Sequence, residues 1–415
     1  MASKIILHVF LLSLLFIFIP YNQNNSCASY LGYLFPSFSN DCYHNPDVDN
    51  NITNIIQRHA TSPETHQVQT QDGFILSLFR IPRENPRGVI LFQHCYLCDA
   101  RIWVTQHNES IAFLFWRAGY DVWLGNSRGN FYSKRHATLS PSDGEFWNYS
   151  FFELGYYDVH ASVEYIKATT NHSKIIFMGY SLGGSAGLVY SSMRPEDATK
   201  SLRIIVSIAA ATHFRYAFGP MEFVTSFIFK MQSFNNHTGI YSIGRYDSWG
   251  LKFFRISHRL FPFKKYLPYA ISFFFGWTPD EMDPSYSNLM ISQFGSESSL
   301  NIIYHGYQQR LLGIFQAYDY GEIKNMRLYG STNPLLYPLE KIKVPVFLVY
   351  SYDDWFCHYK DNELVHNRLP EEAKIYGKLA VKGINHVDFA YGKRRNQEVY
   401  NKILKVLNSL PKTFD

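Results

Sequence analysis

Charged residues are scarce in this chain of 415 residues: they make up 18% of the sequence, and the formal net charge is only +5. Lysine and arginine are scattered and form no long basic run, so nothing suggests nucleic acid as a partner. No internal repeat or low-complexity tract is visible either. What remains is a chain that is 46% hydrophobic and long enough for one large α/β domain with an inserted subdomain.

Cysteine is also rare, with five residues in all. The spacing His94-Cys95-x-x-Cys98 resembles half of a metal site, but no second ligand pair follows at a suitable spacing. We therefore expect no bound metal. Loss of Cys27 with a leader would leave an even number of cysteines that could be oxidised, namely Cys42, Cys95, Cys98 and Cys357. Their pairing cannot be deduced from the sequence.

The apolar stretch from Ile5 to Ile19 is shorter than the about 20 residues that a membrane-spanning helix needs. It follows Lys4 and precedes small residues that end at Ala28, which is the pattern of a signal peptide covering residues 1–28. A retained signal anchor is the alternative.

Five N-x-S/T acceptors lie beyond this segment, at Asn51, Asn108, Asn148, Asn171 and Asn236. Because such sites are glycosylated only in the secretory pathway, we expect a secreted or lysosomal protein. Asn148 lies in an aromatic stretch, where burial would leave it unmodified.

Aromatic residues, in contrast, are abundant, with 34 Phe and 31 Tyr. They are dense between Thr212 and Tyr337, where strand–helix alternation stops and prolines interrupt the apolar runs. We interpret residues 212–337 as an inserted helical cap that covers the sheet and faces a substrate cavity with part of its apolar surface. The alternative is that these aromatic side chains only pack the cap onto the core.

The stretch from Lys174 to Ser185 predicts the catalytic centre. A short apolar strand, residues 175–178, runs into Gly179-Tyr-Ser181-Leu-Gly183, and residues with helical spacing follow. This G-x-S-x-G pattern between a strand and a helix is typical of a nucleophile elbow, which exposes the serine hydroxyl at the top of a sheet. An ordinary β–α turn is the alternative.

Apolar strands alternate with helical segments on both sides of the elbow, which predicts a mostly parallel sheet of the α/β-hydrolase type. The predicted strands are residues 89–93, 120–124, 175–178, 202–209, 344–350 and 378–381, and a hairpin is predicted around Gln71-Asp72-Gly73. The core would then comprise residues 29–211 and 338–415, on either side of the cap.

The order Ser, Asp, His along the chain is required in this fold. Asp353 and Asp354 follow a buried strand, and His386 follows the last one. We expect His358 and His366, in the loop or helix after the aspartates, to be surface residues.

Several longer motifs make the chain resemble the acid lipases of the gastric and lysosomal type, a family of secreted or lysosomal α/β-hydrolases with a cap that act on neutral lipid esters. The matching segments are His66-x-Val-x-Thr-x-Asp72-Gly-Phe-Ile-Leu76, Gly119-Tyr-Asp-Val-Trp-Leu-Gly-Asn-x-Arg128-Gly-Asn-x-Tyr-Ser133, Phe146-Trp147, Glu153-x-Gly155, Tyr157-Asp158, His305-x-x-Gln308, Phe315-Gln-Ala-Tyr-Asp-Tyr-Gly321 and Asn385-His-x-Asp-Phe389.

The resemblance implies a serine esterase that needs no cofactor, works by Ser181, His386 and Asp354, and contacts a lipid surface transiently. It selects Asp354 over Asp353, and it implies that the backbone N–H groups of Tyr96 and Leu182 bind the oxyanion.

Two departures from the family pattern stand out. Cys95 replaces the glycine after the loop histidine, and the residues after the aspartate, 355–358, do not follow the usual pattern. Cys95 would either tilt the Tyr96 N–H or be held aside by a bond to Cys98. A lipid-binding or carrier protein that keeps the fold and has lost turnover is therefore the alternative to a lipase.

Overall fold

The computed structural model describes residues 25–27, 42–44, 47–48, 50–260, 266–283, 286–293 and 295–411. Most of the predicted signal peptide, including its apolar stretch and Ala28, lies outside these residues. Within the described residues, no helix has both the length and the apolar character needed to cross a membrane.

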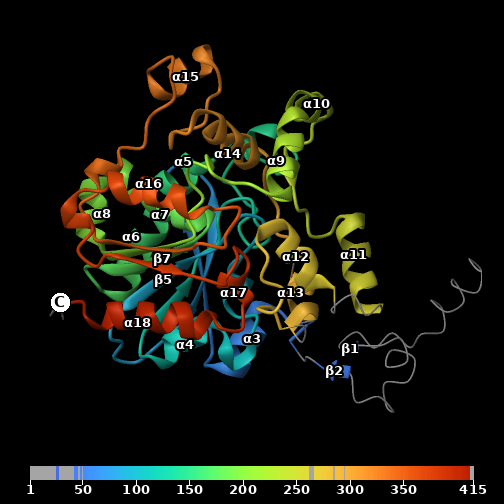
Figure 1. Cartoon of the computed structure of the whole chain (residues 1–415). Coiled ribbons are helices and arrows are strands. Elements are labelled where there is room, and N and C mark those ends of the chain that lie inside the picture. Colours follow the sequence, from blue (N-terminus) through green and yellow to red (C-terminus); the bar gives the residue numbers. More distant parts are fainter. Residues whose placement is uncertain are drawn as a thin grey trace, which may run out of the picture.

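One eight-stranded sheet forms the centre of the protein, in the order β12-β11-β8-β7-β5-β6-β4-β3 (Figure 1). The strands from β12 to β6 are parallel, and β4 pairs antiparallel with β6 and β3. The predicted mostly parallel sheet is thereby confirmed. The strands are β3 (Glu64–Gln69), β4 (Ile75–Ile81), β5 (Val89–Gln93), β6 (Asp121–Leu124), β7 (Ile175–Tyr180), β8 (Leu202–Ile208), β11 (Val346–Ser351) and β12 (Lys378–Val381).

The central strands are buried on both faces, which is why their sequences are apolar without alternation. Helices cover both sides, with α4 and α18 on one side and α6, α7, α8 and α16 on the other (Figure 1). The helices of the core are α3 (Ile52–His59), α4 (Ile111–Arg117), α5 (Phe151–Glu153), α6 (His160–Thr170), α7 (Leu182–Met193), α8 (Pro195–Ser201), α16 (Tyr359–Arg368), α17 (Asp388–Tyr391) and α18 (Asn401–Asn408).

Two helical segments begin with a π-helical turn. The apolar spacing of residues 154–166 predicts one helix, which starts as the π-helix η5 (Leu154–Val159), and the apolar spacing of residues 396–410 predicts a closing helix, which starts as the π-helix η10 (Asn396–Tyr400). A pattern of apolar spacing over a few residues does not separate α-helical turns from single π-helical turns, since both keep one side of the segment buried.

Between β8 and β11 the chain leaves the sheet and is mainly helical. Its helices are α9 (Pro220–Lys230), α10 (Gln232–Thr238), α11 (Trp249–Leu260), α12 (Leu267–Phe275), α13 (Ser287–Gln293), α14 (Asn301–Leu312) and α15 (Glu322–Tyr329). Within this segment, β9 (Ser242–Ile243) and β10 (Ser298–Ser299) form a two-stranded antiparallel pair that joins the first half of the segment to the second. A second small pair, β1 (Asn25–Cys27) with β2 (Cys42–His44), lies near the N-terminus.

Candidate active site

The turn between β7 and α7 holds Ser181 in an unusual backbone conformation, with φ 56° and ψ −118°. Such a positive φ is strained for a residue with a side chain and persists only where the surroundings impose it. Gly179 and Gly183 make the turn sterically feasible: a Cβ on Gly179 would lie 2.3 Å from the Gly183 carbonyl oxygen, and one on Gly183 would lie 2.3 Å from the Gln93 carbonyl oxygen. The tight turn thus presents Ser181 at the carboxyl end of the central strand.

Ser181, His386 and Asp354 come together from three separate strand ends. Nε2 of His386 lies 3.0 Å from the Ser181 Oγ, and Nδ1 of His386 lies 2.7 Å from Oδ2 of Asp354. All three side chains are buried. If Nδ1–H donates to the carboxylate, Nε2 is left free to accept the serine proton, which is the arrangement that a general base requires.

The Asp354 carboxylate has a second set of partners. Its Oδ1 accepts hydrogen bonds from the backbone N–H of Phe356 at 2.9 Å and of Cys357 at 2.8 Å. These bonds fix the carboxylate while its other oxygen faces the imidazole. The unusual sequence after Asp354 therefore still forms a turn that holds the acid.

Cys357 is a free, buried thiol beside this group. Burial, with the Asp354 charge nearby, raises its pKa well above the usual value. The Cys357 sulfur, a carboxylate oxygen of Asp354 and a ring nitrogen of His386 lie within 4.8 Å of one another. Within the described residues, these three side chains form the group that is close enough together to hold a metal ion. The imidazole and carboxylate are already bonded to each other there.

The loop after β5 carries the predicted oxyanion donor Tyr96. A disulfide joins Cys95 to Cys98, with 5.4 Å between their Cα atoms, and the residue with positive φ in this loop is Leu97, at 56°, rather than Cys95. Cys95 thus has a backbone conformation that tolerates a side chain. In the described part of the chain, neither the Tyr96 nor the Leu182 backbone N–H donates to a protein acceptor.

His94 fixes the start of this loop. Its Nε2 accepts from the Ser127 backbone N–H and from the Asn130 side chain, both at 3.0 Å, so its Nδ1–H donates to the Cys95 carbonyl oxygen at 2.7 Å. Burial lowers the pKa of His94, which favours the neutral form that these bonds need. The segment around Asn126 to Asn130 therefore supports the loop that carries Tyr96, a role that its sequence did not indicate.

An apolar pocket of about 210 Å³ opens at Ser181. The core contributes Tyr96, Leu97 and Leu182 to its wall, and the inserted helices α9 and α14 contribute most of the rest. Among them are Val224, Ile228, Ile302 and Ile303; an ion pair between Glu222 and Arg310, 3.2 Å apart, also lines it. The inserted segment thus supplies apolar surface directly beside the serine.

Some contacts of the site could not be predicted from the sequence. Tyr180 donates its hydroxyl to the His386 carbonyl oxygen at 2.5 Å, and Phe275 at the end of α12 stacks on the His386 ring with 6.0 Å between centroids. The Asn385 side chain donates to the Gly276 carbonyl oxygen at 3.0 Å. These contacts attach the histidine loop to the core and to the inserted segment, and they depend on residues that are far apart in the chain.

The glycosylation candidates differ in their surroundings. Asn51, Asn108, Asn171 and Asn236 are exposed, whereas Asn148 is half-buried. The Asn51 side chain also caps α3 by accepting from the Asn54 backbone N–H. His358 and His366 are half-buried rather than fully exposed.

Known proteins match this chain over most of its length. Residues 52–107 match the partial alpha/beta-hydrolase lipase region, and residues 88–237 match the alpha/beta hydrolase fold. Lipase member K from Homo sapiens is 31% identical over 379 residues, which cover 87% of this chain and 91% of that protein. Gastric triacylglycerol lipase from Mus musculus is 29% identical over 88% of this chain and 93% of its own length.

Solved structures add to the evidence for the fold. The alpha/beta hydrolase GrgF from Penicillium sp. sh18 superposes with a TM-score of 0.51 over 84% of this chain and 98% of its own, at 14% identity. A soluble variant of monoglyceride lipase from Saccharomyces cerevisiae gives a TM-score of 0.50 over 85% of this chain and 96% of its own, also at 14% identity.

Proposed function

Because this chain belongs to the acid lipase family of the gastric and lysosomal type, we propose that it hydrolyses neutral lipid esters, triacylglycerols or steryl esters, through a Ser-His-Asp triad. Its class, a carboxylic ester hydrolase, follows from the family. The observation that carries the finer proposal is the position of the Ser181 hydroxyl, bonded to His386 at the mouth of an apolar pocket.

In the proposed reaction, the Ser181 Oγ attacks the ester carbonyl carbon while its proton passes to Nε2 of His386. Asp354 holds the imidazole orientation and stabilises the imidazolium that forms. The proton then passes to the departing alcohol, and an acyl-enzyme remains. Water, deprotonated by the same imidazole, attacks the acyl carbon. The bond from that carbon to the Ser181 Oγ then breaks, the imidazolium returns its proton to Oγ, and the fatty acid is released.

The negative oxygen that develops during each attack needs donors. We assign this role to the backbone N–H groups of Tyr96 and Leu182, which lack protein acceptors in the described part of the chain. The disulfide from Cys95 to Cys98 and the bonds of His94 support the position of the first donor.

The acyl chain is assigned to the apolar pocket beside Ser181. Burial of each methylene group there contributes about 0.8 kcal/mol, so an acyl chain supplies much of the binding energy. We further propose that residues 212–337 act as a cap that binds a lipid surface. Large apolar side chains are exposed on its helices, for example Phe223 on α9, Trp249 on α11 and Phe273 on α12.

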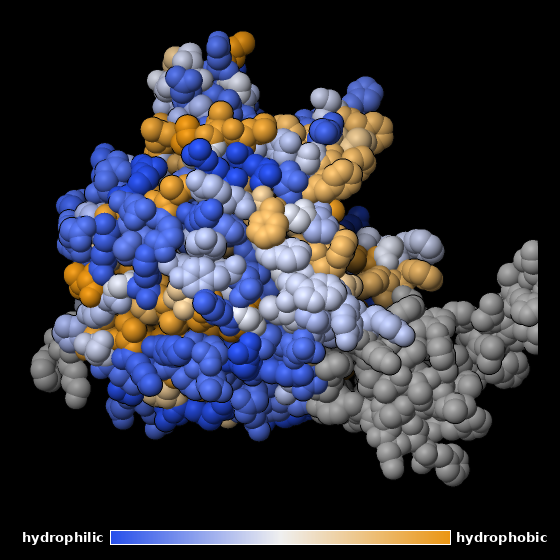
Figure 2. Space-filling model, viewed as in Figure 1, coloured by the Kyte–Doolittle hydropathy of each residue, from blue (hydrophilic) through white to orange (hydrophobic). Residues whose placement is uncertain are grey.

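Figure 2 supports this assignment: apolar surface gathers over α9 and α12 on the right of the view, whereas the face over α4 and α18 is mostly hydrophilic. Exposed aromatic side chains of this size are costly in water and are typical of surfaces that contact lipid. The place of action in this proposal is outside the cell or in the lysosome, after removal of residues 1–28.

The test is active-site labelling with a fluorophosphonate probe, followed by peptide mapping and by assays on emulsified trioleoylglycerol and cholesteryl oleate. We expect the label on Ser181 and release of fatty acid from at least one emulsion. An unlabelled Ser181 in a folded protein that binds lipid without turnover would instead identify the carrier alternative.

A further inference from the structure

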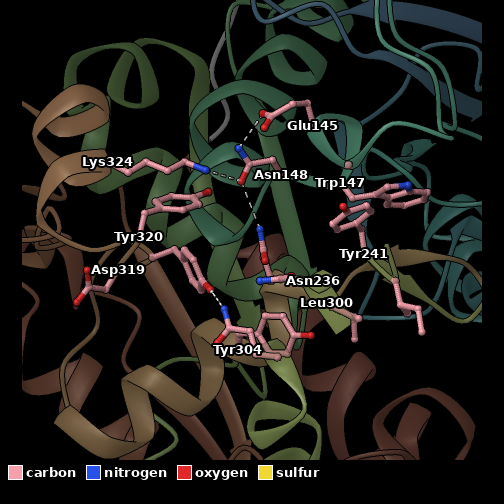
Figure 3. Close-up of a pocket in the computed structure, with 15 residues that line it drawn as sticks. Glu145, Trp147, Asn148, Asn236, Tyr241, Leu300, Tyr304, Asp319, Tyr320 and Lys324 are labelled. Atoms are coloured by element: carbon pink, nitrogen blue, oxygen red, sulfur yellow. Dashed lines mark hydrogen bonds between the residues drawn. The ribbon is translucent and has the colours of Figure 1, made fainter. Parts of the chain in front are cut away.

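A second and larger pocket, of about 520 Å³, lies where the inserted segment meets the core (Figure 3). The core contributes Glu145 and Trp147 from the 3-10 helix η4 (Gly144–Trp147), and α10 contributes Gln232 and Asn236. None of the proposed catalytic residues lines it. This volume is within the range of about 300–1,000 Å³ that is usual for small-molecule sites.

The lining combines aromatic rings with amides and charged groups. Trp147, Tyr241 and Tyr304 supply rings, and the charged residues of the lining are Glu145, Asp319 and Lys324. The excess of carboxylates disfavours an anionic ligand. A sugar ring has apolar C–H faces that pack on aromatic rings and a rim of hydroxyls that both donate and accept hydrogen bonds, so this lining suits a carbohydrate.

Two of the predicted glycosylation acceptors, Asn148 and Asn236, line this same pocket. Their side-chain amides differ in their hydrogen bonds. The Asn148 amide is engaged: its Nδ2 donates to Oε2 of Glu145 at 3.1 Å, and its Oδ1 accepts from Lys324 and Asn301, each at 3.5 Å (Figure 3). Asn236 is exposed in the last turn of α10, and Gly239, in a left-handed conformation with φ 72°, ends that helix. Asn236 is therefore the acceptor that can carry a sugar without the loss of these bonds.

We propose that Asn236 carries an N-glycan whose first sugar residues occupy this pocket. Nδ2 of Asn236 forms the bond to the anomeric carbon of N-acetylglucosamine, the bond from that carbon to the pyrophosphate of a lipid-linked oligosaccharide breaks, and the amide loses a proton. The inference rests on the proposed passage through the secretory pathway, where that donor is found.

The seated sugar would join α10 to the core helix η4 and so attach the cap to the core. Gly144 already brings the two parts close, since a Cβ on it would lie 2.8 Å from the Tyr241 ring. The helix α14 lines both pockets: Asn301 and Tyr304 line the second pocket, and Ile302 and Ile303 line the pocket at Ser181. A sugar in this position would therefore also brace one wall of the acyl site.

The test compares Asn236→Gln with the matched control Asn108→Gln in protein secreted from cultured eukaryotic cells. Asn108 is an exposed acceptor in the 3-10 helix η3 (His107–Glu109), has no positive φ, and lines neither pocket. Peptide mass spectrometry should find glycan at Asn236 in the wild type. Asn236→Gln should lower Tm by about 2 °C, whereas Asn108→Gln should leave it unchanged. On folded protein, peptide N-glycosidase should remove the glycan at Asn236 more slowly than that at Asn108.

The pocket itself is tested by Glu145→Ala. If the sugar contacts this wall, Glu145→Ala should lower Tm in the glycosylated protein, and the loss should be smaller in the Asn236→Gln background. An equal decrease of Tm on Glu145→Ala in both backgrounds would overturn the proposal.

An unmodified Asn236 beside a glycosylated Asn51 or Asn171 would overturn this inference alone. Absence of glycan from all five acceptors would instead contradict the secretory location, and the inference with it. If Asn236→Gln has the wild-type Tm and binds free chitobiose, the pocket takes a carbohydrate from outside the chain, which also overturns the proposal.

Discussion

Asp353 and Asp354 are neighbours in the chain, yet their carboxylates bind different parts of the last loop. Asp354 accepts from Nδ1 of His386 at 2.7 Å, whereas Oδ2 of Asp353 accepts from the backbone N–H of Gly383 at 2.6 Å. The two residues thus form a matched pair for mutation, because one faces the imidazole and the other supports the backbone before it.

Asp354→Asn is expected to lower kcat by about 10³ or more, because members of a triad act as a unit. Ser181→Ala and His386→Ala should cause losses of the same order. Asp353→Asn should lose far less, since an amide oxygen can still accept from Gly383. Steady-state kinetics on a soluble ester, with circular dichroism to check folding, decide the matter. A dead Asp353→Asn beside an active Asp354→Asn would contradict the assignment.

The disulfide between Cys95 and Cys98 leads to a prediction about turnover. If Cys95 tilted the Tyr96 N–H, which is one of the two outcomes that the sequence allows, Cys95→Gly would raise kcat. With Cys95 bonded to Cys98 and its φ not positive, we expect Cys95→Gly and Cys98→Ser both to lower kcat, by as much as about 10²-fold, with little change in KM. An increase in kcat in Cys95→Gly would mean that the bridge distorts the oxyanion site.

The acyl pocket predicts a change in chain-length preference. Ile228→Trp adds bulk to the pocket wall, so kcat/KM for long-chain esters should fall at least tenfold, because each methylene kept out of the pocket loses about 0.8 kcal/mol of burial. Butyrate esters should be affected little. Phe227→Trp is the control, because Phe227 is exposed on the same helix and does not line the pocket. Equal losses for short and long esters in Ile228→Trp would argue against this pocket as the acyl site.

The exposed aromatic side chains predict a preference for emulsified substrate. The double variant Phe223→Ser and Trp249→Ser, at residues that are 73% and 80% exposed, should turn over emulsified long-chain esters several-fold more slowly. Its kcat on a soluble short-chain ester should match the wild type, because neither side chain lines the pocket at Ser181. The measurement is binding to, and hydrolysis of, a lipid emulsion of defined surface area. Parallel losses on both substrates would place the defect in the site and not at the surface.

Asp388, two residues after His386, predicts a dependence of stability on pH. Burial raises the pKa of Asp388 from the usual 3.8 to about 7. Hydrogen bonds from Thr278 and from the Asn385 backbone lower this pKa, but by less than burial raises it. Among the nearby charges, Glu281 raises the pKa and Arg394 lowers it. The folded protein therefore keeps a proton that the unfolded chain releases between about pH 4 and 7. The contribution of protonated Asp388 to the free energy of unfolding is fully present below pH 4 and is lost as the pH rises towards 7.

Asp388→Asn should thus remove part of the decline in the free energy of unfolding between pH 4 and 8, by at most about 4 kcal/mol at 1.36 kcal/mol for each pKa unit. Denaturant unfolding across this range measures it, with the exposed Glu322→Gln in α15 as the control. An identical pH profile in wild type and Asp388→Asn would contradict the raised pKa.

Much of the fold could be read from the sequence, because its physical causes are local. Strands buried on both faces have to be apolar without alternation, so β5, β7 and β11 stood out as short apolar runs. The turn at Ser181 needs glycines where a Cβ would clash, and that requirement is visible as Gly179 and Gly183. Chain order then led to His386 and to the neighbours Asp353 and Asp354 as candidates, and the family resemblance selected Asp354.

Other features depend on residues that meet only in the folded chain. The partner of Cys95, the stacking of Phe275 on His386 and the support of His94 by the segment around Asn130 follow no local spacing. The sequence determined that the protein has an α/β sheet with a serine at its edge. Tertiary packing decided which helices wall the pocket at Ser181 and which acceptor asparagines share a second cavity, since both result from contacts between segments that are far apart along the chain.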